Sequence, residues 1–579
     1  MSLLVARRWP VPRRAPAAIG LLARSQRSYT QPSGPGIRPL RDRAIIISAS
    51  VNTKPNQLLS SISVHPERAI SNSFFVFFVT PSYASFLFDD DALLNKALRR
   101  AYTQATRHPS HRIQALCAVV DKLPVSEPFA ASPSIQDEVL RRSTKLAVAG
   151  AGLEGIAYVV LPAGASVPSN ELLPSDKGAI DFIIAEHKTK NSILRDTLRL
   201  PLANTVFQTG KPCTMTLSTW ETRVVGKEQP LMKELKLVSK TNVSHHGISL
   251  IFKWAKEGPP MSVVSALSIP LVPLTMPRRV EGCMGNIIRL LVGPQGTIIQ
   301  ASSELESVVP SFFASRGQPA QPTVAWALVI PEALKQTISD RTEALLSGLP
   351  SENGTGEMDQ DETWPRLWRS DPPVWNTLVS KAVAEGARLH RVLSGGGGWG
   401  KKAGLLSLDP IPASQVADSL EQGQLPSRIN DPEDFASTLT PVVRAGDSIQ
   451  FFITPKSDLA EEAGKVDSLE TLRALPRASP SRLWGWELGT IPNTIDSTPE
   501  NSWQHAPPVW NGATCFKGAF GALTEGGLTL TRHLKVDGDA NYSVSTTTVD
   551  VPFSRFSAVH VAEQQDKREE KDVGEPNTD

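Results

Sequence analysis

A run of glycines and lysines near the middle of the chain has the composition of a phosphate-binding loop. Residues 391–410 read RVLSGGGGWGKKAGLLSLDP, and the pattern G-x-x-x-x-G-K fits Gly395, Gly400 and Lys401. In nucleotide hydrolases the amides of such a loop hold the phosphates, the lysine neutralises them, and the next Ser or Thr ligates magnesium. The spacing therefore raises the question of whether this chain hydrolyses a nucleotide.

The neighbouring residues argue against nucleotide hydrolysis. Lys402 stands where the magnesium-binding Ser or Thr should be, so that contact is missing. A buried strand should lead into the loop, but residues 382–393 have helical spacing. A helix of several turns should follow the lysines, yet only residues 403–409 precede Pro410.

Two interpretations of the loop remain. It is either a Gly-rich turn that joins a helix to a strand, or a nest of amides around the Trp399 ring that binds a phosphate, a carboxylate or an RNA backbone. In the second case the ligand would be held by seven residues of this segment, namely Arg391, Ser394, Gly395, Gly398, Trp399, Lys401 and Lys402.

Two long loops carry further candidate binding residues. RLPLANTVFQTGKPCTM (199–215) and PLVPLTMPRRVEGCMGNIIRLL (270–291) have uneven polarity and end in turns at Gly210 and Gly285. Loops carried by a rigid sheet are where binding side chains concentrate, although both segments could equally be structural crossovers. The polar candidates on the two loops are Asn204, Gln208, Arg278, Arg279 and Asn286.

Side chains suited to metal binding or catalysis are not grouped in the sequence. No C-x-x-C, G-x-S-x-G or H-E-x-x-H pattern occurs, and the histidine pairs at 108–111 and 244–247 lack further ligands at metal spacing. Tryptophan–arginine runs at 364–375 and 482–488 could stack nucleic-acid bases, although tryptophans more often anchor a core. We therefore expect no metal site and no catalytic residue, and the sequence specifies no cofactor. The cysteines, too widely spaced for zinc or a disulfide framework, are Cys117, Cys213, Cys283 and Cys515.

The start of the chain has the composition of a mitochondrial transit peptide. The first 30 residues contain six arginines and no acidic residue, with Leu, Ala and Ser interleaved, and the first acid is Asp42. We expect residues 1–29 to be removed on import to the matrix. Loss of six arginines takes the formal net charge from +2 to −4, which disfavours broad binding of nucleic acid.

The rest of the chain has the pattern of a mixed α/β (α+β) protein with helices packed on mixed sheets. Strand patterns at 73–79 and 113–120 flank an amphipathic helix at 89–105, which indicates a βαβ unit. No apolar run is long enough to span a membrane. Further strands are expected at 44–48, 155–161, 179–185, 247–254, 261–269, 323–330 and 446–454, with a capped helix at 301–313, a helix at 375–393 and a hairpin turning at 526–527.

Composition divides the chain into parts. We expect an N-terminal α/β domain at 44–335, a polar acidic linker at 336–375 and a C-terminal α+β domain at 376–562. The charged tail at 563–579 is expected to be disordered.

Several segments resemble the FIST sensory domain family. NSFFVFFVTPSY, DALLNKALRRAYTQ and IQALCAVVDKLP are similar to its opening strand, helix and strand, and CMGNIIRLL with ASSELESVV to the junction of its halves. VVRAGDSIQFFIT and GATCFKGAFGAL resemble its later strands, so the resemblance spans about residues 44–530. The glycine loop and the tryptophan-rich insertion are not family features, and the usual Cys-x-x-Arg-Gly ending is missing. FIST domains are thought to bind small ligands such as amino acids, so the resemblance implies a ligand pocket between two α/β halves.

These observations favour a non-catalytic small-ligand-binding or sensory protein of the mitochondrial matrix. The alternative is an accessory factor of mitochondrial gene expression that contacts RNA or the mitoribosome through the glycine loop and the Trp–Arg segments. An unrecognised enzyme and a structural subunit are further alternatives. The sequence does not specify the oligomeric state.

Overall fold

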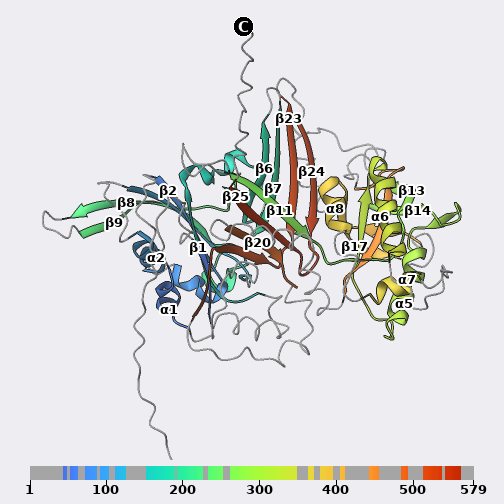
Figure 1. The fold of residues 1–579 in the computed structure, drawn as a ribbon, viewed down its shortest axis with the longest axis horizontal. Coiled ribbons are helices and arrows are strands. Elements are labelled where there is room, and N and C mark those ends of the chain that lie inside the picture. The colour runs from blue at the N-terminus through green and yellow to red at the C-terminus, as the bar shows by residue number, and fades with distance from the viewer. Residues whose placement is uncertain are drawn as a thin grey trace, which may run out of the picture. The chain divides into compact units, whose positions relative to one another are not determined.

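The computed structural model describes the chain in seventeen ranges, which together hold four β-sheets and a small number of helices (Figure 1). All of these residues belong to one compact unit, Pro39–Asp579. Parallel and antiparallel strand pairs occur together, which confirms the mixed α/β class. None of the helices in the described ranges is long and apolar enough to cross a bilayer. The ranges are 43–48, 53–62, 72–87, 92–102, 111–124, 152–175, 177–188, 192–225, 232–251, 261–348, 363–370, 378–395, 404–410, 442–455, 484–492, 513–536 and 542–562.

The first sheet has seven strands and contains the βαβ unit expected from the sequence. β2 (Asn72–Val79) and β3 (His111–Val119) pair in parallel, and α2 (Ala92–Tyr102) lies between them in the chain. Because β2 is almost entirely apolar, both of its faces are buried, with Phe74 in one core and Phe75 in the other. The strand order is β21–β1–β4–β2–β3–β8–β9, where the other strands are β1 (Arg43–Ser48), β4 (Gly155–Pro162), β8 (Met215–Val225), β9 (Met232–Asn242) and β21 (Ala513–Lys517).

Helices cover one face of this sheet and a second sheet covers the other. Side chains of α1 (Pro55–Ser60), η1 (Pro81–Leu87) and α2 share a core with Phe75. On the opposite face, Phe182 and Leu198 of the second sheet share a core with Phe74. The second sheet has the order β24–β23–β7–β6–β10–β5, and Figure 1 shows β6, β7, β23 and β24 side by side. Its strands are β5 (Ser166–Val167), β6 (Ala179–Lys188), β7 (Ser192–Pro201), β10 (His245–Ser249), β23 (Leu528–Val536) and β24 (Tyr542–Val549).

Six antiparallel strands close into a small barrel. Each of β13, β14, β18, β17, β16 and β19 pairs with the next, and β19 pairs again with β13. Its interior is filled by side chains such as Val280, Ala327 and Phe451, as expected for a barrel of this size. The strands are β13 (Arg278–Met284), β14 (Ile287–Val292), β16 (Ala325–Ile330), β17 (Arg388–Gly395), β18 (Leu406–Leu408) and β19 (Ser448–Ile453).

The remaining elements pack around these three units. α5 (Ser303–Ser315) and α7 (Thr363–Trp368) contribute to the barrel core, whereas α6 (Lys335–Ser347) and α8 (Leu378–Glu385) contribute to the core that contains Phe74. A four-stranded sheet has the order β11–β25–β20–β22. Its strands are β11 (Met261–Ser268), β20 (Trp484–Thr490), β22 (Ala519–Thr524) and β25 (Arg555–Ala562).

Three local expectations are wrong. The helix expected over 375–393 ends at Glu385, because Gly386 adopts φ +113° and the chain continues as β17. The glycine loop therefore connects two antiparallel barrel strands, not a helix and a strand. The turn at 526–527 does not form a hairpin, since β22 pairs with β20 while β23 pairs with β7 and β24. The side-chain cap expected for the helix at 301–313 is not formed at the start of α5, because Ser302 makes no cap hydrogen bond and the Ser303 hydroxyl donates to the Gln300 carbonyl.

Sheet pairing crosses the expected domain boundaries. β21 pairs with β1, β23 with β7, β19 with β13 and β25 with β11, so every sheet combines strands from 44–335 and 376–562. Most of α6 and all of α7 lie within 336–375, the segment expected to be a polar linker. The expected transit peptide, the acidic run at 351–362 and the charged tail lie outside the described residues.

Candidate functional site

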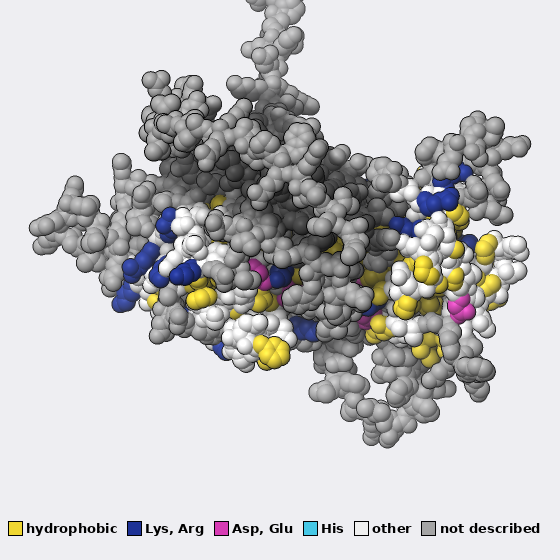
Figure 2. All heavy atoms as spheres, turned by 90° about the horizontal axis from the view of Figure 1, so that it is seen from below, with side chains coloured by type: hydrophobic (Ala, Val, Ile, Leu, Met, Phe, Trp, Pro, Cys, Tyr) yellow, Lys and Arg dark blue, Asp and Glu magenta, His cyan; other side chains and the backbone are white. Residues whose placement is uncertain are grey.

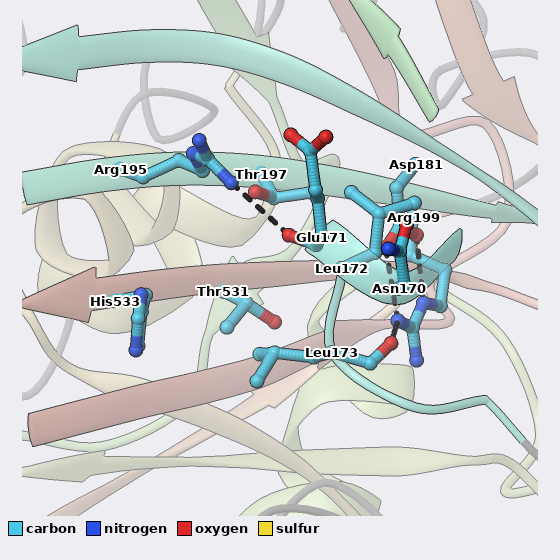
Figure 3. Close-up of a pocket in the computed structure, with 10 residues that line it drawn as sticks. All are labelled: Asn170, Glu171, Leu172, Leu173, Asp181, Arg195, Thr197, Arg199, Thr531 and His533. Carbon is cyan, nitrogen blue, oxygen red and sulfur yellow. Dashed lines mark hydrogen bonds and ion pairs between the residues drawn. The ribbon is translucent and has the colours of Figure 1, made fainter. Parts of the chain in front are cut away.

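A pocket with a volume of about 260 Å³ lies on the face of the second sheet that is turned away from the core (Figure 3). β7 and β23 form its floor, β6 contributes Asp181, and the segment 170–173 forms a wall. This volume lies just below the range of about 300–1,000 Å³ that is usual for drug-sized ligands, so the pocket suits a smaller, metabolite-sized molecule.

The floor of the pocket follows from the register of two antiparallel strands. Thr197 of β7 lies opposite Thr531 of β23, and Arg195 lies opposite His533. Side chains alternate along a strand, so these four point to the outer face while their neighbours, such as Leu198, are buried in the core. Opposed residues have Cβ atoms about 5 Å apart. The floor therefore presents two neighbouring hydroxyls beside a guanidinium and an imidazole.

A buried ion pair anchors one end of the pocket. The Asp181 carboxylate, on a side chain only 2 % exposed, accepts hydrogen bonds from Nε and Nη2 of Arg199 at 2.7 and 2.9 Å. His245 Nε2 lies 3.0 Å from the same carboxylate. Burial alone would raise the pKa of Asp181, but the contacts with Arg199 and His245 outweigh burial and lower it. Asp181 is therefore a carboxylate that fixes the Arg199 side chain.

Two arginines of β7 hold the wall of the pocket against the sheet. Arg199 donates to the carbonyls of Leu173 and Pro174 at 2.7 and 3.0 Å, and Arg195 donates to the Glu171 carbonyl at 3.2 Å. Figure 3 shows the hydrogen bonds to Leu173 and Glu171, and the Glu171 carboxylate directed away from His533. The wall is thus attached to the floor by hydrogen bonds from charged groups, which are stronger than neutral ones.

Gly247 of β10 allows the wall to approach the sheet. A Cβ atom at this position would lie 2.8 Å from Val167 Cβ and 3.0 Å from Leu172 Cδ1. We expect Gly247→Ala to lower the free energy of unfolding by about 1–3 kcal/mol, because the wall must move outward to relieve the overlap. The matched control is Gly164→Ala, where an added Cβ meets nothing within 4 Å. Urea unfolding should show a change within about 0.5 kcal/mol for the control, and an equal loss in both variants would contradict the packing argument.

A second polar pair lies near the pocket but does not line it. The Ser166 hydroxyl is 3.0 Å from His246 Nε2, and the imidazole packs against the Phe74 ring. Burial, with a smaller contribution from His245, lowers the pKa of His246 to about 4. A serine and a histidine at this distance can act as nucleophile and base. Neither residue lines the pocket, however. A ligand in the pocket would therefore not contact the Ser166–His246 pair, and we interpret the pair as structural.

The residues expected at the glycine loop are only partly described. Arg391, Ser394 and Gly395 lie on β17. Burial raises the pKa of Asp550, and the hydrogen bond from Trp326 and the nearby charge of Arg391 offset only part of that rise. Trp326 donates this hydrogen bond from Nε1 at 2.8 Å. The other expected ligand residues of this segment, Gly398, Trp399, Lys401 and Lys402, lie outside the described residues.

The candidates on the two long loops are separate from the pocket. Asn204 accepts a hydrogen bond from the Val206 amide, and Asn286 donates to the Leu408 carbonyl at 2.8 Å. Arg278 forms an ion pair with Glu304. Gln208 and Arg279 are exposed. Three of these five side chains therefore have local structural contacts, and none of the five lines the pocket.

The pocket residues were not found from the sequence, although a signal for them exists. In LRDTLRLP (194–201) and LTLTRH (528–533) leucines stand at every second position, apart from Asp196 and Arg532, which is typical of a strand with one buried face. Such alternation shows that Arg195, Thr197 and Thr531 share the outer face of their strands. It does not show that the two strands, more than 300 residues apart, are neighbours. Within the described ranges, no group of three or more His, Cys, Asp or Glu could hold a metal ion.

Comparison with known proteins returned no similarity. The chain matches no protein-family model, no curated protein and no solved structure. The functional argument therefore depends on the fold and on the chemistry of the pocket.

Proposed function

We propose that this chain is a non-catalytic, small-ligand-binding protein of sensory type, and that its ligand occupies the pocket between β7, β23 and the segment 170–173. The observation that carries the proposal is the lining of the pocket, which combines hydroxyls, a guanidinium, an imidazole and a carboxylate around a metabolite-sized space. The ligand is a small polar molecule with hydrogen-bond acceptors for Arg195 and for the two threonine hydroxyls.

Two features of the sequence support the sensory role and the location. The segments similar to FIST domains imply a small-ligand-binding protein, and the arginine-rich, acid-free first 30 residues are typical of a matrix protein. We place the protein in the mitochondrial matrix on this basis. Carboxy-terminal green fluorescent protein fused to the full chain should co-localise with a matrix marker, and cytosolic fluorescence would contradict the location.

Mass spectrometry of the endogenous protein, purified gently with and without nuclease, tests the proposal directly. We expect a molecule that survives nuclease and leaves on denaturation. Nuclease-sensitive RNA or co-purified ribosomal proteins in its place would favour the accessory factor of gene expression. If no molecule is retained and no compound of a broad metabolite collection raises the melting temperature, the ligand-binding proposal fails.

A double variant connects the ligand to this pocket. Thr197→Val with Thr531→Val removes both floor hydroxyls while keeping β-branched side chains, so the strands should be retained. We expect the dissociation constant for the retained molecule to rise about tenfold or more, because each lost hydrogen bond contributes about 0.5–1.5 kcal/mol. Isothermal titration calorimetry measures the change. Thr548→Val, on the same face of β24 but outside the lining, is the control and should bind as the unmodified protein does.

A further inference from the structure

The charged side chains that line the pocket compensate one another. Arg195 and Arg199 carry two positive charges, and Asp181 and Glu171 carry two negative charges. The other titratable group of the lining is His533, which is charged only when it is protonated. Because burial of an uncompensated charge is costly, a phosphate or carboxylate group has no surplus of positive charge to attract it into this pocket.

Groups of basic side chains lie elsewhere on the molecule. Figure 2 shows Lys and Arg side chains gathered at both ends of the drawn face. Anions attracted by such exposed charges are held weakly and are released by salt. Binding of an anion to the surface and binding in the pocket must therefore be distinguished by experiment.

The Arg199 guanidinium has little capacity left for a ligand. Of its five N–H donors, one on Nε and one on Nη2 bind Asp181. Another on Nη2 and one on Nη1 bind the carbonyls of Leu173 and Pro174. Arginine recognises a carboxylate or a phosphate best through two parallel hydrogen bonds, and Arg199 already uses such a pair on Asp181.

Neither carboxylate of the lining is placed to bind an ammonium group above the floor. Both oxygens of Asp181 accept hydrogen bonds from Arg199, and the Asp181 side chain is buried. Glu171 is exposed, and Figure 3 shows its carboxylate directed away from Thr531 and His533. The lining is therefore a poor match for an amino acid, because the ammonium group would be left without a partner.

The floor and the wall of the pocket differ in polarity. Thr197 and Thr531, opposite each other in the sheet, offer hydroxyl groups that both donate and accept hydrogen bonds. The wall contributes the apolar side chains of Leu172 and Leu173 to the same space. A ligand that fits both surfaces has hydroxyl groups on one side and C–H groups on the other. The ring of a monosaccharide or a cyclitol has this arrangement and carries no charge.

We propose that the ligand of this pocket is an uncharged, polyhydroxylated ring of monosaccharide size. Its hydroxyl groups bond to Thr197 and Thr531, and its C–H groups pack against Leu172 and Leu173. The inference rests on the proposed function and adds the chemical class of the ligand. A single ring of this kind suits a volume of about 260 Å³.

Matched pairs of probes test the charge of the ligand on the unmodified full chain. Isothermal titration calorimetry compares D-glucose, D-ribose and myo-inositol with their monophosphates, with gluconate and with L-serine. We expect at least one uncharged ring to bind, and its monophosphate to bind at least about tenfold more weakly. Tighter binding of a charged probe overturns the inference if Thr197→Val with Thr531→Val weakens it, and the proposed function then stands.

The molecule retained by the endogenous protein decides the case in which none of these rings binds. An uncharged polyol in the mass spectrum supports the inference, whereas a phosphate, a carboxylate or an amine overturns the inference alone. If nothing is retained and no compound of the broad metabolite collection binds, the proposed function fails and the inference fails with it.

Salt and one change in the wall supply the closing measurement on the ring that binds. Between about 0.01 and 1 M sodium chloride the screening length falls from about 30 to about 3 Å, and the dissociation constant should change less than about twofold. Leu173→Ala should raise it about tenfold through lost apolar contact, whereas Leu393→Ala, on β17 and outside the lining, should leave it unchanged. A tenfold or larger rise with salt, or unchanged binding by Leu173→Ala, contradicts the inference.

Discussion

Asp181→Asn should lower the free energy of unfolding by about 3–5 kcal/mol, because it leaves the Arg199 guanidinium in place without its carboxylate. The Arg199 side chain is 16 % exposed and that of Asp181 is 2 % exposed, so water can replace the lost partner only in part. Asparagine keeps the size of the side chain but offers one acceptor oxygen where the carboxylate offers two. His245, 3.0 Å from the carboxylate, also loses its partner. Urea unfolding at pH 7 measures the loss.

The same sheet supplies a matched control for this prediction. Arg532 of β23 donates to Asp196 of β7 at 2.8 Å from both Nε and Nη2, with the same bidentate geometry as Arg199 and Asp181. The side chain of Arg532 is 48 % exposed and that of Asp196 is 24 % exposed. Exposed ion pairs contribute about 0–1 kcal/mol. Asp196→Asn should therefore lower the free energy of unfolding by at most about 1 kcal/mol. If Asp181→Asn and Asp196→Asn lower the free energy of unfolding equally, burial does not determine the strength of the Asp181–Arg199 ion pair.

Loss of the Asp181 pair should also affect the pocket. Arg199, which Asp181 holds in position, donates to the Leu173 and Pro174 carbonyls. Released from Asp181, it would hold the wall of the pocket less firmly, so Asp181→Asn should weaken binding of the retained ligand. Asp196→Asn, on the opposite face of the sheet, should not.

Elements with a strong local pattern could be predicted from the sequence. The run SFFVFFV has no polar position, and the following helix has one apolar face, so a buried strand and a covering helix are the arrangement that satisfies both. The structure confirms this unit, with β2 and β3 parallel. Strands β1, β4, β6, β16 and β19 were likewise identified by their apolar composition.

The strand β17 was mistaken for part of a helix because both of its faces are buried around Leu389 and His390, although Leu393 near its end is 55 % exposed. Leu389 packs in the core shared with α8, while His390, opposite Ala327, is also buried. A strand of this kind has no alternation between polar and apolar positions, and the charged residues Arg388 and Arg391 further obscure it. Periodicity alone cannot separate such a strand from a helix.

The pocket could not be predicted because it depends on pairing between distant strands. β7 and β23 are each recognisable as amphipathic strands, but their register brings Thr197 opposite Thr531 only in the folded sheet. β1 and β21 are farther apart still in the chain and pair directly. Local sequence carries no information on such pairing, which is decided by how the apolar faces of all the strands are buried together.

Acid should destabilise this protein between about pH 6.5 and pH 4 through two buried histidines. Burial lowers the pKa of His246 to about 4, with a smaller effect of His245, and burial likewise lowers the pKa of His390 to about 4. In the unfolded chain each titrates near 6.5. Between these values the unfolded state binds more protons, so stability rises with pH, is complete above about pH 6.5 and is lost as the pH falls toward 4. Each histidine accounts for about 3 kcal/mol over this window.

Asp121 has the opposite effect of the two histidines on the pH dependence of stability. Burial raises its pKa to about 6, despite the hydrogen bond it accepts from the Glu525 amide. The folded state then binds more protons than the unfolded state between about pH 4 and pH 6, so this carboxyl stabilises the fold at low pH and that stabilisation is lost as the pH rises through 6. Two histidines oppose one carboxyl, and the net result expected for the three groups is destabilisation by acid.

Single variants separate the three contributions through the pH dependence of stability. His246→Gln and His390→Asn keep a polar group near the positions that contact Ser166 and the Asp409 carbonyl, respectively. Each should reduce the slope of unfolding free energy against pH, measured from urea titrations between pH 4.5 and 7, by up to about 1.4 kcal/mol per pH unit. Asp121→Asn should steepen the same slope, because it removes the group that opposes the histidines. An unchanged slope in His246→Gln would show that this imidazole is already protonated in the fold, and would contradict its burial between the two sheets as a neutral group.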